Sequence, residues 1–236
     1  MKKKHGKKYL EVAKNIEEGK MYSMDEAVAL LKKTNPTKFD ASAEVHFYLG
    51  VDPKQADQNI RTTVALPHGT GKEIRVVAFV GEEKIKEAKA AGAVEAGTEV
   101  LIEKIEGGWL EFDVAVATPD QMKNLGKIAK TIGQKGLMPN PKTGTVTTEI
   151  SKTISEIKKG KVEVRVDKLS NLHNVFGKVS FDGAKLKDNL KAIVKAVLDS
   201  KPASSKGTYI KSLNVTTTMG PSIPLDVLAA SVEAKK

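Results

Sequence analysis

The segment from Val215 to Pro221 reads VTTTMGP and combines three hydroxyl side chains with a methionine and a glycine. Hydroxyls can bond to phosphate oxygens, ribose 2′-hydroxyls and base edges, while methionine offers a soft apolar contact. Glycine lets another backbone approach closely. The same residues also suit a β-branched strand followed by an ordinary turn, and residue chemistry alone slightly favours that structural interpretation.

A second segment, from Gly133 to Val146, reads GQKGLMPNPKTGTV and contains three glycines, two prolines and two lysines. A loop of this length usually has a defined shape or a binding role. Residue chemistry alone supports a structural loop and a binding loop equally.

Two glycine motifs lack the spacing of a nucleotide site. The stretch His68–Lys72 (HGTGK) has Leu66 where a phosphate loop needs its first glycine and Glu73 where it needs a hydroxyl. A tight turn at a domain junction is the better interpretation. Further along, only Gly81 precedes a helical pattern, and the two glutamates after it would repel a pyrophosphate while suiting a helix N-terminus.

The four histidines, His5, His46, His68 and His173, show no metal-ligand spacing, and the chain has no cysteine. No Gly-x-Ser-x-Gly motif is present. We therefore expect no catalytic residue, no metal and no cofactor. We expect His46 and His173 on the polar faces of strands, where an ordinary surface role is favoured over RNA contact.

Composition favours a globular protein with a polyanionic partner. The 236 residues are 40% hydrophobic and 29% charged, and the formal net charge is +10 with a pI near 9.5. No run is long enough to cross a bilayer, and no apolar stretch follows the basic start as a secretory signal requires. We expect a cytoplasmic protein that does not bind membranes.

The pattern of apolar residues predicts two kinds of region. Alternation of period two in the first and last thirds of the chain predicts strands at 43–50, 61–67, 162–166, 177–181 and 209–218. Helices are predicted at 9–18, from a Ser23–Glu26 capping box up to Asn35, and at 186–198.

The middle of the chain alternates apolar strands with helices, which is typical of a parallel sheet covered on both faces. The expected strands lie at 74–81, 100–102 and 112–117, and the expected helices at 82–91, 119–132 and 151–159. The fold class is therefore α/β and α+β: a discontinuous α+β domain (1–67 and 160–236) with an inserted three-layer, Rossmann-like α/β domain (68–159).

The positive charge is concentrated in the outer domain. Residues 68–159 contain 14 basic and 13 acidic residues, a net charge of +1, whereas the rest contains 25 and 16, a net charge of +9. A surface that serves only solubility has no reason to be so uneven, so a polyanion site on the outer domain is favoured.

Three long motifs in order resemble the bacterial large-subunit ribosomal protein L-one family over nearly the whole chain. They are DQNIRTTVALPHGTGK (57–72), GQKGLMPNPKTGTV (133–146) and VTTTMGP (215–221). The resemblance implies the same two-domain organisation. It also implies large-subunit rRNA binding at the mobile stalk near the tRNA exit site, help in releasing deacylated tRNA, and repression of the protein's own operon through its mRNA.

The resemblance also implies an RNA-binding surface on the outer domain and secondary contacts on the inserted one. Ser42 stands where some family members have threonine, which keeps the hydroxyl and loses a methyl group. The implied primary contacts are Lys38, Phe39, Ser42, Glu44, Arg165, Asp167, Lys168, His173, Ser212, Thr216, Thr218, Met219 and Gly220. The expected secondary contacts are Lys127, Lys130, Lys135 and Lys142.

The expected partners are therefore large-subunit rRNA within the ribosome, exit-site tRNA and the protein's own mRNA. The expected free form is a monomer. An enzyme that uses the α/β block as a nucleotide site would need a phosphate loop, and a scaffold for an acidic protein would bind RNA without specificity.

Overall fold

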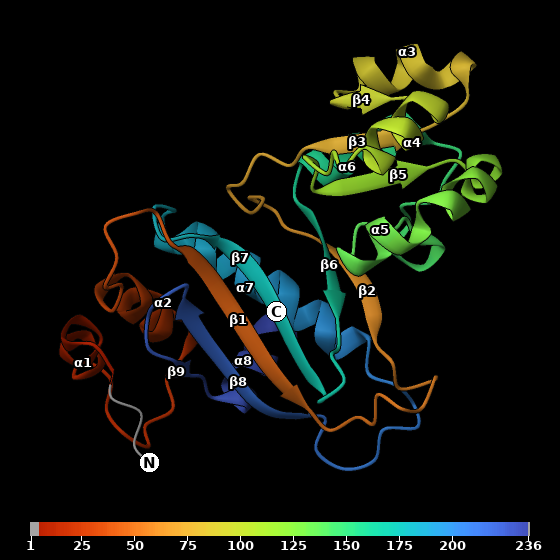
Figure 1. Ribbon diagram of the computed structural model, residues 1–236. Helices are drawn as coiled ribbons and strands as arrows, with labels where there is room; N and C mark the ends of the chain where they lie inside the picture. The colour runs from red at the N-terminus through yellow and green to blue at the C-terminus, as the bar shows by residue number, and fades with distance from the viewer. Residues whose placement is uncertain (1–4, 236) are drawn as a thin grey trace. The chain divides into compact units, whose positions relative to one another are not determined.

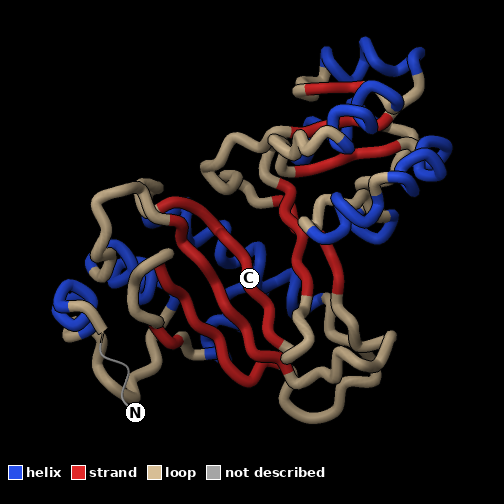
Figure 2. The backbone as a smooth tube through the Cα atoms, viewed as in Figure 1, coloured by secondary structure: helices blue, strands red, loops and turns tan. Residues whose placement is uncertain are grey.

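The computed structural model describes residues 5–235, and the chain divides into two compact units. Unit 1 combines Met1–Gly71 with Val162–Lys236, and unit 2 is the continuous stretch Lys72–Lys161 between them. Figure 1 labels the elements of each unit, and Figure 2 shows where strands give way to helices and loops along the chain.

Unit 1 is built on a four-stranded sheet with the strand order β7-β1-β8-β9. β1 lies antiparallel to β7 on one side and to β8 on the other, and β8 pairs with β9. The strands β2 and β6 form a separate two-stranded sheet. The elements are α1 (Lys7–Ala13), α2 (Met24–Lys33), β1 (Ser42–Leu49), β2 (Arg61–Ala65), β6 (Lys161–Arg165), β7 (Asn171–Lys178), α7 (Gly183–Asp199), β8 (Ile210–Thr217), β9 (Ile223–Pro224) and α8 (Val227–Lys235).

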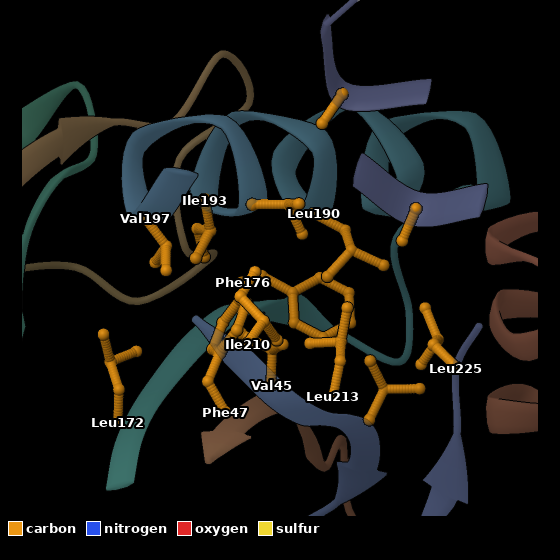
Figure 3. Close-up of a cluster of buried hydrophobic side chains, with 14 of the residues drawn as sticks. Val45, Phe47, Leu172, Phe176, Leu190, Ile193, Val197, Ile210, Leu213 and Leu225 are labelled. Atoms are coloured by element: carbon orange, nitrogen blue, oxygen red, sulfur yellow. The ribbon is translucent and has the colours of Figure 1, made fainter. Parts of the chain in front are cut away.

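One face of this sheet is buried in the hydrophobic core of unit 1. Alternate residues of β1 and β8 point into it, and the inward stripe of α7 packs over them (Figure 3). The helices α2, α7 and α8 cover this face (Figure 1). The labelled core residues are Val45, Phe47, Leu172, Phe176, Leu190, Ile193, Val197, Ile210, Leu213 and Leu225.

Unit 2 is a three-layer α/β structure around the parallel sheet β4-β3-β5. Val77 and Phe79 of β3 face one apolar cluster, while Val76 and Ala78 face another, so both sides of the sheet are buried. The elements are β3 (Val76–Phe79), α3 (Glu82–Ala90), β4 (Glu95–Ala96), α4 (Glu99–Glu106), β5 (Val114–Ala117), η1 (Pro119–Lys127), α5 (Ala129–Gln134), η2 (Pro141–Thr143) and α6 (Ile150–Lys158).

The mixed fold class is confirmed, and so is the Ser23–Glu26 capping box at the start of α2. The strand expected at 100–102 is wrong, because these residues lie in α4. Leu101, Ile102 and Ile105 form a buried helical stripe, while Val100 is 63% exposed. A run of three apolar residues is too short to show a period, so it fits a helix as well as a buried strand.

Two smaller expectations also differ from the structure. The helix expected at 9–18 ends at Ala13, and the strand expected at 177–181 is the end of β7, which begins at Asn171 and stops at Lys178. Neither β9 nor α8 was expected from the sequence. The helix expected at 119–132 is confirmed as helical, with a 3₁₀ segment before α5.

The first connection between the units begins with a segment tied to unit 1. The buried Asn189 side chain accepts from the His68 backbone N–H (3.0 Å) and donates to the carbonyls of Gly69 and Phe176 (both 2.8 Å). Gly71 has φ +74°, and an added Cβ there would meet the Phe181 ring at 2.9 Å. The two units therefore meet between residues 71 and 72 and between residues 161 and 162, a few residues later than the expected domain boundaries. That each unit is a functional domain stays a prediction.

Among residues 5–235, no helix has the length and apolar character that a membrane crossing requires.

Candidate nucleic-acid interface

The second face of the unit 1 sheet is polar and partly open to solvent. Residues that alternate with the core positions line it on three neighbouring strands, and register places Glu44 beside Thr216 and Tyr48 beside Ser212. We call this surface the open face. It consists of Ser42, Glu44, His46 and Tyr48 of β1, Asn171, His173 and Val175 of β7, and Ser212, Asn214 and Thr216 of β8.

Five of the expected contacts lie on the open face: Ser42, Glu44, His173, Ser212 and Thr216. At about 3.4 Å per residue, an eight-residue strand spans roughly 25 Å, which is enough to follow several nucleotides. The polar groups are mostly hydroxyls, amides and imidazoles, so the face is suited to reading shape and sugar edges rather than to pure charge attraction.

At one end of the open face, the turn after β8 is joined to the start of β1. The Thr218 backbone N–H donates to the Ser42 carbonyl (3.1 Å), and the Ser42 N–H donates to Thr218 Oγ1 (3.0 Å). Lys178 Nζ donates to Ser42 Oγ (3.1 Å) and brings a cation to this end. Met219 follows with 60% of its surface exposed.

The shape of the turn depends on the side chains of Thr216 and Thr217. Thr216 Oγ1 lies 3.0 Å from the Gly220 carbonyl and 3.2 Å from the Pro221 carbonyl, so its single proton is directed into the turn and its lone pairs remain available as acceptors. A Cβ on Gly220 would lie 2.2 Å from Thr217 Oγ1, a buried atom. Glycine at this position is therefore a packing requirement that leaves Met219 exposed.

Lys38 and Phe39 lie in the segment before β1, and both are exposed. Phe39 is 57% exposed, and its carbonyl accepts from Thr37 Oγ1 at 3.2 Å. An exposed phenyl ring offers a stacking surface for an unpaired base. The structure places Phe39 in a segment that leads directly into Ser42, the first residue of β1.

At the other end of the open face, the β6–β7 turn carries Asp167 and Lys168. Asp167 Oδ1 accepts from the backbone N–H groups of Leu169 (2.8 Å) and Asn171 (2.7 Å), and Ser170 adopts φ 67°. Partial burial alone would raise the pKa of Asp167, but these N–H donors outweigh it and lower the pKa. Asp167 thus shapes the turn, which accounts for a carboxylate in a basic region.

Arg165 is exposed at the end of β6, which belongs to the other sheet, so it does not lie on the open face. With Asp167 and Lys168 it lines a hollow of about 560 Å³ beside Pro53 and Asn59. Two exposed cations at the rim of a hollow suit a phosphate backbone.

Five residues of the open face were missing from the expected contacts: His46, Tyr48, Asn171, Val175 and Asn214. Tyr48 is 42% exposed, with Lys211 Nζ 4.8 Å from its ring centroid. Asn214 lies between Ser212 and Thr216 on the same side of β8. Alternation of period two marked Tyr48 and Asn214, whereas the aromatic–cation pairing depends on register and had no sequence signal.

Unit 2 has its own basic segment, from Gln121 to Thr148, which contains five lysines and no acidic residue. The four lysines expected as secondary contacts, Lys127, Lys130, Lys135 and Lys142, are all exposed, and no ion pair within residues 5–235 is found for them. By contrast, Glu82 and Glu83 occupy the first turn of α3 at the carboxyl end of the parallel sheet.

The loop within this segment has a defined shape. The Asn140 carbonyl lies within 3.1 Å of Thr143 Oγ1 and Thr145 Oγ1, and its side chain accepts from the Lys142 N–H (2.8 Å). Gly144 closes the turn with φ 67°. The loop is thus ordered by its own residues and leaves Lys142 at the surface, so the structural and binding interpretations are compatible.

A metal has no evident place in this arrangement. Within residues 5–235, no group of three or more His, Cys, Asp or Glu side chains is arranged to hold a metal ion.

Comparison with known proteins gives the same family as the motifs. The model of the ribosomal protein L1p/L10e family matches residues 31–221. The chain belongs to this family. A relative, the large ribosomal subunit protein uL1 of Salinispora arenicola (strain CNS-205), is 54% identical over 222 residues, covering 94% of this chain and 93% of the relative. The match of the family model includes β1, β7 and β8, the three strands of the open face.

Proposed function

We propose that this protein is a component of the large ribosomal subunit and binds large-subunit rRNA at the mobile stalk near the tRNA exit site. The open face, with the Thr218–Gly220 turn at one end and the Arg165–Lys168 region at the other, is the proposed primary contact. The observation that carries the proposal is the convergence of hydroxyls and amides on one partly exposed sheet face, with exposed Met219 in the turn at its end, in a chain of this family.

The proposed recognition combines shape reading with a moderate electrostatic contribution. Hydroxyls and amides of the open face contact 2′-hydroxyls and sugar edges, while Lys38, Arg165, Lys168 and Lys178 contact phosphates. Only a few cations take part. A plot of the logarithm of the association constant against the logarithm of the salt concentration should therefore have a slope of about −0.7 for each phosphate neutralised in a single-stranded segment.

The first experiment compares affinity for a stalk-derived rRNA fragment with affinity for a scrambled RNA of equal length, across salt concentrations. Tight binding to the stalk fragment that falls roughly tenfold or more in Thr218→Ala or Met219→Ala supports the proposal. Leu228→Ala is the matched control, because Leu228 is an exposed apolar side chain of α8, away from the open face. Equal, weak and steeply salt-dependent binding to both RNAs contradicts the proposal.

We further propose that unit 2 provides secondary RNA contacts and helps to release deacylated tRNA from the exit site. The acid-free segment around Lys127, Lys130, Lys135 and Lys142 supports this role, since exposed unpaired lysines bind phosphates. Replacing these four lysines by alanine should slow tRNA release from ribosomes in a stopped-flow assay and leave stalk affinity within about threefold. An unchanged release rate contradicts the role.

The same primary surface is proposed to repress the protein's own operon by binding its mRNA. Competition is the test: the stalk fragment and the operon leader should displace one another, and Met219→Ala should weaken both by similar factors. Independent binding of the two RNAs contradicts a shared site. The free protein is proposed to be a cytoplasmic monomer without catalytic activity, and its mass in solution tests the monomer.

A further inference from the structure

Two histidines lie side by side on the open face. His46 of β1 and His173 of β7 are opposite in register, and their Nδ1 atoms are 2.8 Å apart. Their ring centroids are 5.0 Å apart with planes inclined at 62°. A nitrogen–nitrogen distance this short is a hydrogen bond, so one Nδ1 donates a proton and the other accepts it.

The outer nitrogen of each ring faces a carboxylate. His46 Nε2 is 3.8 Å from Glu44 Oε2, and His173 Nε2 is 3.9 Å from Asp167 Oδ2. On its other side, β8 opposes His46 with Asn214, which is uncharged. The charged groups that face the pair are therefore two carboxylates, while the cations Arg165 and Lys168 belong to the strand and turn that carry Asp167.

The neutral histidine pair can take up one more proton without losing its central hydrogen bond. In the neutral pair, the ring that donates from Nδ1 has a bare Nε2, whose lone pair faces a carboxylate. One added proton at that Nε2 gives both outer nitrogens an N–H directed at a carboxylate and keeps the central bond. A second added proton would place two N–H groups against each other at 2.8 Å and would break the pair.

The surroundings of His46 also oppose a second added proton on the pair. Burial lowers the pKa of His46, the neighbouring His173 lowers it further, and Glu44 partly raises it. The short central bond therefore excludes a charge on both rings at once, because each charged ring would carry an N–H at Nδ1. The pair and its two carboxylates carry a local charge of −2 without the extra proton and −1 with it.

We propose that the His46–His173 pair is a single-proton switch for RNA binding, in which protonation of the pair halves the local negative charge and so weakens the repulsion of an RNA phosphate beside it. This inference rests on the proposed RNA-binding function of the open face. The neutral pair leaves Glu44 and Asp167 uncompensated against a phosphate, and one proton removes half of that charge. By linkage, a bound phosphate in turn favours protonation of the pair.

The test measures affinity of the full-length protein for the stalk-derived rRNA fragment at fixed ionic strength between pH 6 and pH 8. Affinity should rise as the pH falls, by at most about tenfold per pH unit because a single proton is taken up. His46→Asn and His173→Asn should each flatten this dependence. His68→Asn is the matched control, since His68 pairs with Asp188 away from the open face and should keep the wild-type slope.

A second measurement needs no RNA. In an NMR titration of the free protein, the pair should take up a single proton as the pH falls, whereas two independent imidazoles would take up two. Circular dichroism confirms that each variant is folded, and either variant alone decides the question. If the wild type binds no stalk RNA at any pH, the proposed function fails. If it binds with a pH dependence that both pair variants retain, only the switch is overturned.

Discussion

Single residues at the ends of the open face shape the turns that carry exposed neighbours. Asp167 accepts hydrogen bonds within the turn that carries Lys168, and the Thr216 hydroxyl bonds within the turn that carries Met219. A substitution at either position therefore shifts the neighbouring side chains in the turn and also removes the hydrogen bonds of the substituted residue.

The sharpest test at this scale is Gly220→Ala. The added Cβ would lie 2.2 Å from buried Thr217 Oγ1, so the turn must shift and carry Met219 with it. We predict a loss of about 1–3 kcal/mol in unfolding free energy and at least a tenfold loss of stalk RNA affinity. Thermal melting and RNA titration measure the two. Gly183→Ala, whose Cβ meets Val28 at an ordinary 3.8 Å, should change neither.

Tyr209 gives a pH-dependent prediction. Burial raises the pKa of Tyr209 to about 12, and its hydroxyl donates to the Val197 carbonyl at 2.9 Å. A raised pKa contributes stability that is complete below the unfolded value of 10.0 and is lost as the pH rises through about 12.

Tyr209→Phe should therefore cost about 1–2 kcal/mol at pH 7, because the Val197 carbonyl loses its donor. Between pH 10 and pH 12, the wild type should lose up to about 3 kcal/mol more than the variant, as a two-unit shift implies. Urea unfolding of both proteins at each pH measures the difference. A constant gap across this range would show that the hydroxyl does not titrate as a buried group.

At the scale of elements, the sequence predicted β1 and β8 well because one side of each strand is buried, whereas only the end of β7 was expected. Val45, Phe47 and Leu49 alternate with polar residues, and the core fixes which set points outward. The strand expected at 100–102 failed because a short apolar run has no period of its own. β9 was missed since two residues of strand carry no pattern.

The candidate site was predictable only in part. Hydroxyls near the end of β8 suggested a contact from chemistry, and the family resemblance supplied most of the rest. The His46–His173 bond could not be foreseen, because register between β1 and β7 depends on a bulge at Ala43 and Glu44 and on residues more than a hundred positions apart. The turn function of Asp167 likewise depends on backbone geometry rather than on residue type.

The element that anchors the first connection gives another prediction. Asn189 is fully buried and satisfies three backbone groups, two of them in the segment His68–Gly69. Asn189→Leu should cost about 2–4 kcal/mol because those groups lose their partners. Amide exchange at His68 should also accelerate. Asn189→Ala with unchanged exchange at His68 would show that the segment is held by other contacts.

At the scale of the whole molecule, charge separates the two units. Unit 2 contains 15 basic and 13 acidic residues, a net charge of +2, while unit 1 contains 24 and 16, a net charge of +8. The long-range attraction for a polyanion therefore arises mainly from the unit that carries the open face.

Removing 72–161 and joining Gly71 to Val162 through a short glycine linker should keep most of the stalk RNA affinity, within about tenfold. Titration at two salt concentrations measures the affinity and its salt slope. Circular dichroism establishes that the shortened chain is folded. A folded chain that no longer binds the stalk fragment would move the primary contact to unit 2.

The order of strands in the sheet also matters during synthesis of the protein. The bonds between Ser42 and Thr218 join residues 176 positions apart, and β8 lies between β1 and β9. Unit 2 is continuous and can fold as soon as it leaves the ribosome, whereas the open face is complete only after β8 has been made. A nascent chain interrupted before β8 thus lacks Ser212, Asn214 and Thr216 and the turn that follows them, so only a chain that extends past β8 presents the complete open face.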